Sequence, residues 1–194
     1  MDAVGLITEY NPFHNGHLYH LRESRRASGA EVAVAVMSGH FLQRGEPALF
    51  DKWVRTEMAL RAGVDVVVEI PFPFACNSAP HFARGAVQLL DAFGGSVSSL
   101  CFGSEAGEID GLQRCSDLLV RHEADLERGS AALLRAGLTF PAARARLVAE
   151  LADSATAALL ASPNNILGLA YLRAINETGS SLRPLTIEIG RAHV

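Results

Sequence analysis

The stretch AVGLITEYNPFHNGH, residues 3–17, carries the first prediction of the fold. Ala3–Thr8 is a short apolar run that predicts a buried strand. The chain then turns through Asn11-Pro12 and Asn15-Gly16, and the residues from His17 to Ala27 predict a helix. A buried strand that passes through a tight loop directly into a helix is typical of α/β sheets.

The same alternation continues along the chain. Further strands are predicted at Glu31–Met37, Val64–Ile70, Val97–Phe102 and Leu185–Ile189. The runs AVGLI, EVAVAV and VVV are almost wholly apolar, which indicates strands covered on both faces. We therefore expect an α/β fold with a doubly wound, parallel, Rossmann-like sheet.

Helices are predicted between these strands. Asp51 is a plausible N-cap for a helix that reaches Ala62, and another helix runs from Ser78 or Ala79 to about Asp91. Pro163 is suited to the first turn of a helix that ends near Asn176. Two longer helical stretches are predicted at Ile109–Glu127 and at Ala131–Leu160, the second interrupted near Gly137 and Pro141. They form a helical insertion at about 106–161 within one domain, 1–194.

Composition narrows the class of protein. The 194 residues include 17 Lys and Arg against 21 Asp and Glu, a net charge of −4, which argues against a basic nucleic-acid clamp. Three cysteines without a C-x-x-C pair favour a reducing compartment. The N-terminus shows no secretory signal, and the longest uncharged run, Ser154–Leu172, contains Pro163. We expect a cytoplasmic protein that does not enter a membrane.

The loop after the first strand is the main candidate site. Ligands bind at the carboxyl ends of the strands in doubly wound sheets, and a helix N-terminus attracts phosphate. His14 and His17 lie in that turn, where two imidazoles can stabilise charge at phosphorus. Two alternatives stay open: ordinary loop or capping histidines, and a zinc site that includes His20. Neither G-x-x-x-x-G-K-[ST] nor G-x-G-x-x-G follows a strand, which excludes the two commonest nucleotide loops.

The motif His14-Asn15-Gly16-His17 resembles the H-x-G-H signature of the HIGH nucleotidyltransferases. The longer string EYNPFHNGHLYHL, residues 9–21, resembles the tRNA(Met) cytidine acetate ligase family more specifically. Further stretches of the chain agree with that family at residues 37–53, 63–71, 78–87, 101–105 and 162–172.

The resemblance implies an ATP-dependent ligase that makes acetyl-adenylate and pyrophosphate from ATP and acetate. The acetyl group then passes to N4 of the wobble cytidine in elongator tRNA(Met), and Mg²⁺ is expected with ATP rather than at a metal site of the protein. The catalytic residues would be His14 and His17. The ATP contacts implied by the matching motifs are Ile7, Thr8, Glu9, Tyr10, Asn11, Pro12, Phe13, Asn15, Gly16, Leu18, Tyr19, His20, Gly103, Asn164, Asn165 and Arg191.

Several of these residues have a second interpretation from the sequence alone. Gly103 leaves room for adenine or ribose, or simply ends a strand, and Asn164 and Asn165 offer amides to the nucleotide or cap a helix. Three cations are candidates for binding phosphate or the tRNA backbone, with an ordinary solvated surface as the alternative: Arg44, Lys52 and Arg55.

The chain departs from the family near residue 188. A later ATP-binding Arg of the family falls at Glu188 or in a gap, and Arg191 is its candidate replacement. Family segments that follow this point are not seen, so the domain is expected to be truncated. Two other functions therefore remain: a HIGH nucleotidyltransferase with another small acceptor, and an ATP-binding domain without catalysis.

Overall fold

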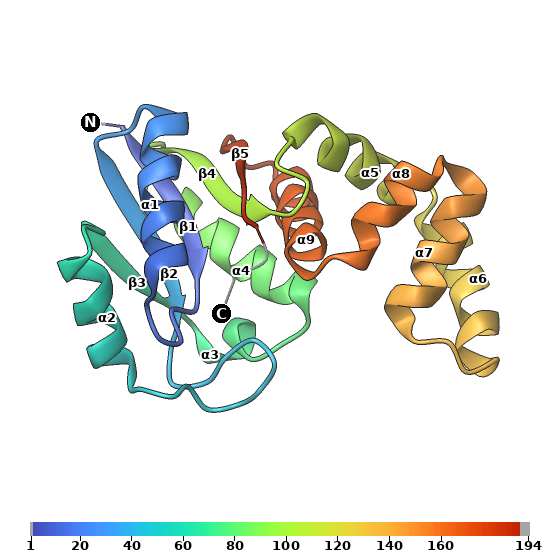
Figure 1. Cartoon of the computed structure of the whole chain (residues 1–194), viewed down its shortest axis with the longest axis horizontal. Coiled ribbons are helices and arrows are strands. Elements are labelled where there is room, and N and C mark those ends of the chain that lie inside the picture. Colours follow the sequence, from blue (N-terminus) through green and yellow to red (C-terminus); the bar gives the residue numbers. More distant parts are fainter. Residues whose placement is uncertain (1, 191–194) are drawn as a thin grey trace.

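The computed structural model describes residues 2–190, with Pro141 described by its backbone only (Figure 1). The strands are β1 (Ala3–Thr8), β2 (Val32–Ser38), β3 (Val66–Ile70), β4 (Val97–Ser104) and β5 (Arg183–Glu188). The helices are α1 (Asn15–Ser28), α2 (Lys52–Arg61), α3 (Phe72–Ala75), α4 (Ala79–Asp91), α5 (Ile109–Arg121), α6 (Glu123–Arg135), α7 (Phe140–Leu151), α8 (Ser154–Ala158), the 3₁₀ turn η1 (Leu159–Ala161) and α9 (Pro163–Thr178).

Within the described residues the strands form one parallel sheet in the order β3-β2-β1-β4-β5. After β1 the chain adds β2 and β3 on one side, and it then returns to add β4 and β5 on the other. This order confirms the predicted doubly wound α/β fold. The loop that leaves β1 lies at the point where the winding direction reverses.

Both faces of β1 and β2 are covered, as their apolar runs predict, whereas the run VVV of the edge strand β3 is only partly buried and Val66 is 37% exposed. On one face Leu6, Ala35 and Cys101 pack with Leu21 of α1. On the other face Val34, Val36 and Leu100 pack with residues of α4, α5 and α9. Among residues 2–190, no helix is both long enough and apolar enough to cross a bilayer.

The segment between β4 and α9 is helical, as expected, and extends beyond the sheet (Figure 1). The predicted start at Ile109 and the predicted interruption near Gly137 and Pro141 are confirmed, but the predicted break between residues 127 and 131 is wrong. The first helix stops at Arg121 and a new one begins at Glu123, and Gly129 lies inside α6 instead of separating two helices. A Cβ on Gly129 would stand 2.8 Å from Leu147 Cδ2, so this glycine serves the packing of α6 against α7.

Candidate functional site

The loop from Glu9 to His14 leads from the carboxyl end of β1 into α1. His14 is the N-cap of α1, and its Nδ1 accepts a hydrogen bond from Gly16 N at 3.0 Å. His17 reaches back, and its Nδ1 accepts from His14 N at 3.3 Å. The two rings stack with 3.7 Å between their centroids and an interplanar angle of 23°. The capping alternative for these histidines is therefore part of the observed geometry.

This capping arrangement fixes where each neutral ring holds its proton. An Nδ1 that accepts a hydrogen bond carries no proton, so the proton of a neutral ring lies on Nε2. Each ring of the pair His14–His17 then keeps an Nε2–H donor that the cap does not use. The pair thus combines a local structural role with two donors suited to an anion at the helix N-terminus.

Burial keeps His17 neutral. Burial, together with the neighbouring His14 and His20, lowers the pKa of His17 to about 4. Burial also lowers the pKa of His20 to about 4, against a smaller opposing effect of the Cys101 backbone. At neutral pH His17 is therefore a hydrogen-bond donor without a positive charge.

An aromatic cluster of Tyr10 and Phe13 packs against His17. Tyr10 is 1% exposed and holds a left-handed backbone conformation with φ 46°, which is costly for a residue with a side chain. Its ring centroid lies 4.8 Å from that of Phe13 and 5.0 Å from that of His17, and Phe13 lies 5.5 Å from His17. The cluster fixes the orientation of His17.

Glu9 and Asn11 connect this loop to the segment between β2 and α2. Glu9 Oε1 accepts from Gln43 N at 2.6 Å, and Asn11 Oδ1 accepts from Leu49 N at 2.7 Å. In this structure the two side chains hold a second loop in place. The sequence motif contained both residues but gave no sign of these partners.

Arg55 has a different role from the one predicted. It is fully buried, and its guanidinium donates to the carbonyl oxygens of Phe50, Glu9, Ser38 and Gly39. The expectation that Arg55 binds phosphate or tRNA is wrong for this conformation, because its side chain is enclosed and bound to the backbone. Arg55 instead joins the ends of β1 and β2 to the start of α2.

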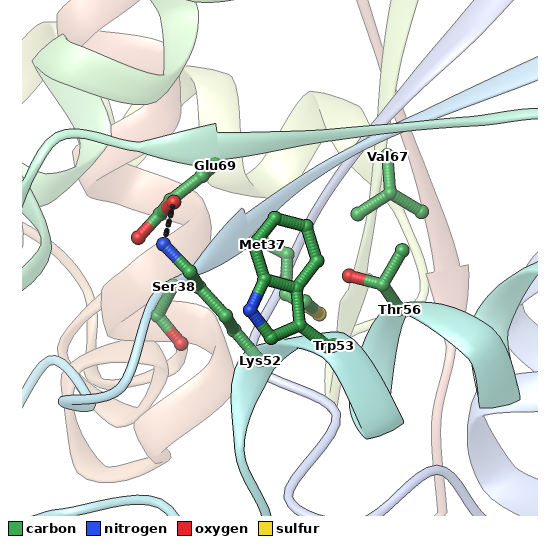
Figure 2. A pocket seen from close by; sticks show the side chains of 7 residues that line it. All are labelled: Met37, Ser38, Lys52, Trp53, Thr56, Val67 and Glu69. Carbon is green, nitrogen blue, oxygen red and sulfur yellow. Dashed lines mark hydrogen bonds and ion pairs between the residues drawn. The ribbon is translucent and has the colours of Figure 1, made fainter.

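The other two predicted cations lie near the surface. Arg44 is exposed in the loop between β2 and α2. Lys52 Nζ forms an ion pair with Glu69 Oε2 at 2.6 Å and lies 5.2 Å from the centroid of the Trp53 ring (Figure 2). Glu69 therefore reaches the rim of the sheet at the end of β3.

Asn164 and Asn165 are brought close to β4 by a contact that the sequence did not reveal. The carboxylate of Glu105 accepts from Asn165 N at 2.9 Å, from Asn164 Nδ2 at 3.0 Å and from Asn164 N at 3.3 Å. Asn165 Oδ1 accepts from Ala106 N at 3.1 Å. Glu105 thus caps the N-terminus of α9, a task predicted for the asparagines themselves.

The two glycines of the predicted site are close to side chains. A Cβ on Gly16 would lie 2.9 Å from His14 Cε1, so glycine is needed at this position for the His14 ring to cover the backbone. A Cβ on Gly103 would lie 2.6 Å from Ile189 Cδ1. The space next to Gly103 that was expected to receive adenine or ribose is occupied by Ile189 in this structure.

The remaining residues predicted to contact ATP lie in β1, in the loop after it and in α1, apart from Arg191. Ile7 and Thr8 are buried at the end of β1, and Pro12 lies in the loop. Asn15, Leu18 and Tyr19 lie in the first turns of α1, where Asn15 and Tyr19 are exposed. Arg191 lies outside the described residues. No group of three or more His, Cys, Asp or Glu among residues 2–190 is arranged to hold a metal ion.

The sequence of the chain matches a known protein family and is similar to curated proteins. A family model described as HIGH Nucleotidyl Transferase matches residues 1–193. The tRNA(Met) cytidine acetate ligase of Syntrophotalea carbinolica is 67% identical over 96% of this chain, and that of Alkaliphilus metalliredigens is 47% identical over 96%. The chain spans 44% and 46% of the length of these two curated relatives.

A solved structure has the same fold. Thermotoga maritima TmcAL bound with alpha-thio ATP superposes with a TM-score of 0.88 at 41% identity, over 100% of this chain and 48% of that one. Its apo form gives a TM-score of 0.87 at 42% identity, over 98% of this chain and 46% of that one. Since the family model matches residues 1–193, the chain belongs to the HIGH nucleotidyl transferase family.

Proposed function

We propose that this chain activates acetate with ATP and passes the acetyl group to N4 of the wobble cytidine of elongator tRNA(Met). The observation that carries the proposal is the stacked pair His14–His17 at the N-terminus of α1, with both Nε2–H donors left over by the cap. The names of the relatives and the ATP analogue in the Thermotoga maritima structure support it.

ATP would lie along the loop Ile7–His20, at the reversal point of the sheet. Its phosphates would meet the Nε2–H groups of His14 and His17, together with the partial positive charge of the α1 N-terminus. Gly103, Asn164 and Asn165 would contact the nucleotide from the other side of that point. Ile189 must then move away from Gly103, or the contact at Gly103 must be made at the strand edge. Arg191 remains the candidate for the later arginine of the family.

In the first step an acetate oxygen attacks the α-phosphorus of ATP. A bond forms between the acetate oxygen and the α-phosphorus, the bond between the α-phosphorus and the oxygen that bridges the α- and β-phosphates breaks, and pyrophosphate leaves. Acetate is ionised well above its pKa of ~4, so this step needs no general base. The protein has to orient the two anions and to stabilise the charge that grows on the phosphates, which the two imidazole donors can do.

In the second step the N4 amine of cytidine attacks the acetyl carbonyl carbon. A C–N bond forms, the C–O bond to the adenylate breaks, AMP leaves, and the amine loses one proton. Acetate, tRNA(Met) and a Mg²⁺ ion that arrives on the ATP phosphates belong to this proposal, as does a cytoplasmic location where tRNA is available. The domain 1–194 would hold the adenylating site.

Isotope exchange between pyrophosphate and ATP tests the first step. With the 194-residue chain, exchange is expected only when acetate is present, because only a reversible adenylation returns pyrophosphate to ATP. Exchange that another small acid supports equally well without acetate would favour a different acceptor. ATP binding without any exchange would favour a domain that binds the nucleotide but does not react.

A further inference from the structure

Two small cavities lie side by side at the carboxyl ends of β2 and β3. The first, of about 200 Å³, is lined by Met37, Ser38, Lys52, Trp53, Thr56, Val67 and Glu69, and we call it the Trp53 pocket (Figure 2). The second, of about 210 Å³, is lined by Gly39, His40, Phe41, Glu69, Ile70, Phe72 and Ala75. Glu69 belongs to both, so a carboxylate stands between them.

The register of the sheet places this pocket beside the ATP loop. Thr8, the last residue of β1, pairs with Met37 of β2, and Met37 pairs with Glu69 of β3. Neighbouring strands lie about 4.8 Å apart, so the backbone of Glu69 is roughly 10 Å from that of Thr8. The Trp53 pocket therefore lies on the same rim of the sheet as the α1 N-terminus, at the end of the strand next to β1.

The pocket presents a large aromatic side chain that the fold does not bury. Trp53 is 71% exposed, at the start of α2, although tryptophan is usually well buried. Figure 2 shows its indole extending toward β3, between the pair Lys52–Glu69 and the side chains of Thr56 and Val67. On the other side of Glu69 the exposed rings of Phe41 and Phe72 lie 5.6 Å apart. Unpaired bases of RNA stack on such side chains.

The charges select what can bind next to Trp53. Glu69 Oε2 is paired with Lys52, whereas Oε1 stands over Gly39 and accepts no hydrogen bond from the described residues. A free carboxylate oxygen repels acetate and phosphate but accepts a hydrogen bond from an amino group. Glutamate and aspartate recognise cytosine through its N4 amine. Uracil carries a carbonyl oxygen at the same position, which a carboxylate oxygen would repel.

We propose that the Trp53 pocket is the acceptor-base site, in which an unpaired cytosine stacks on Trp53 and donates its exocyclic amine to Glu69 Oε1. Lys52 holds the carboxylate in place through its ion pair. The proposal rests on the proposed function, because it assigns the base whose amine is acetylated. It also makes Glu69 the residue that distinguishes cytidine from uridine.

The fluorescence of Trp53 tests this directly, because it is the only tryptophan in the chain. Stacking quenches indole emission, so the 194-residue protein is titrated with hexacytidylate and with hexauridylate, without ATP or acetate. We expect quenching by both, with affinity for hexacytidylate at least ~5-fold higher, the scale of one base-specific contact. Glu69→Gln should reduce the preference to less than twofold, because an amide can donate to the uracil oxygen.

Matched variants separate the pocket from general effects. Glu57→Gln changes a different exposed carboxylate, on the neighbouring helix α2, and should keep the preference for hexacytidylate. By filter binding, Trp53→Ala should lower the affinity at least ~5-fold, and Phe140→Ala, an exposed aromatic of α7, should not. Equal affinity for the two oligomers, quenching by ATP instead of them, or an unchanged preference in Glu69→Gln would overturn the proposal. Pyrophosphate exchange is measured separately, so an active protein without a cytidine preference would refute this site and leave the proposed function standing.

Discussion

The centroids of the imidazole rings of His14 and His17 lie 3.7 Å apart, and the Nδ1 atom of each ring accepts a hydrogen bond from a backbone N–H of the same turn. Two rings at this distance repel each other if both are charged, and His14 is one of the causes of the lowered pKa of His17. With both Nδ1 atoms accepting backbone hydrogen bonds, the pair acts through two neutral Nε2–H donors. This relationship underlies the first prediction.

His17→Ala should lower acetate-dependent pyrophosphate exchange by ~10²-fold or more, because a preorganised donor to the phosphates is lost. The exchange rate at saturating ATP and acetate measures this effect. His122→Ala, a change at a partly exposed histidine between α5 and α6, is the matched control and should keep the wild-type rate. A loss of less than threefold in His17→Ala would remove His17 from the mechanism.

Stability should fall as the pH is lowered from about 6.5 to about 4. His20 has a pKa near 4 in the folded protein and 6.5 when unfolded, so the unfolded chain binds more protons in this window. The stabilisation from neutral His20 is complete above pH 6.5 and is lost as the pH falls through 4. One pKa unit is worth about 1.4 kcal/mol, so the loss is on the order of 3 kcal/mol.

Urea unfolding at pH 7.5, 6, 5 and 4 checks this prediction. The midpoint of the wild type should decrease over the window more steeply than that of His20→Gln, which cannot take up the proton. Parallel pH dependences of the two proteins would show that His20 does not cause the loss of stability.

Arg55→Met should destabilise the fold by roughly 3 kcal/mol or more, because several buried carbonyls lose their donor at a cost of ~1–3 kcal/mol each. Arg61 lies on the same helix with 79% of its side chain exposed, and Arg61→Met should change the free energy of unfolding by less than ~0.5 kcal/mol. Chemical denaturation compares the two. If both variants were equally stable, the bonds of Arg55 would not hold the loops together.

Glu105→Ala should cost ~1–2 kcal/mol, because the first turn of α9 loses a charged cap. Glu108 precedes α5 without a side-chain cap, so Glu108→Ala provides the control. Thermal unfolding of the two variants gives the comparison. A Glu105→Ala protein that melts with the wild type would show that the N-terminus of α9 finds other acceptors.

The sequence predicted best what depends on neighbouring residues. The bounds of β1 agree with the prediction, and Asp51 caps α2 through bonds to Trp53 N and Val54 N, as expected. Both follow from local patterns of apolar and capping residues. Glu105 and Asn165 are hydrogen-bonded to each other although they lie 60 residues apart in the sequence, and no local sequence pattern predicts such a contact.

The burial of a charged side chain and the close packing of two helices also could not be predicted from the sequence. Arginine is usually an exposed residue, so the sequence favoured a surface position for Arg55. Only the tertiary fold brings four carbonyl groups around its side chain. The break predicted between residues 127 and 131 was wrong, because the contact of Gly129 with Leu147 of α7 cannot be seen in the sequence. The His14–His17 motif was different, since its two residues and their cap lie within one turn.

The most direct test of the account follows an oxygen atom from acetate. The chain is incubated with ATP, acetate labelled with ¹⁸O on both oxygens, and hydroxylamine as a simple acceptor, and the mass of the AMP is measured. If acetate attacks the α-phosphorus at the His14–His17 site, each AMP carries one ¹⁸O, because the later cleavage leaves the former acetate oxygen on phosphorus. AMP without the label would contradict the account.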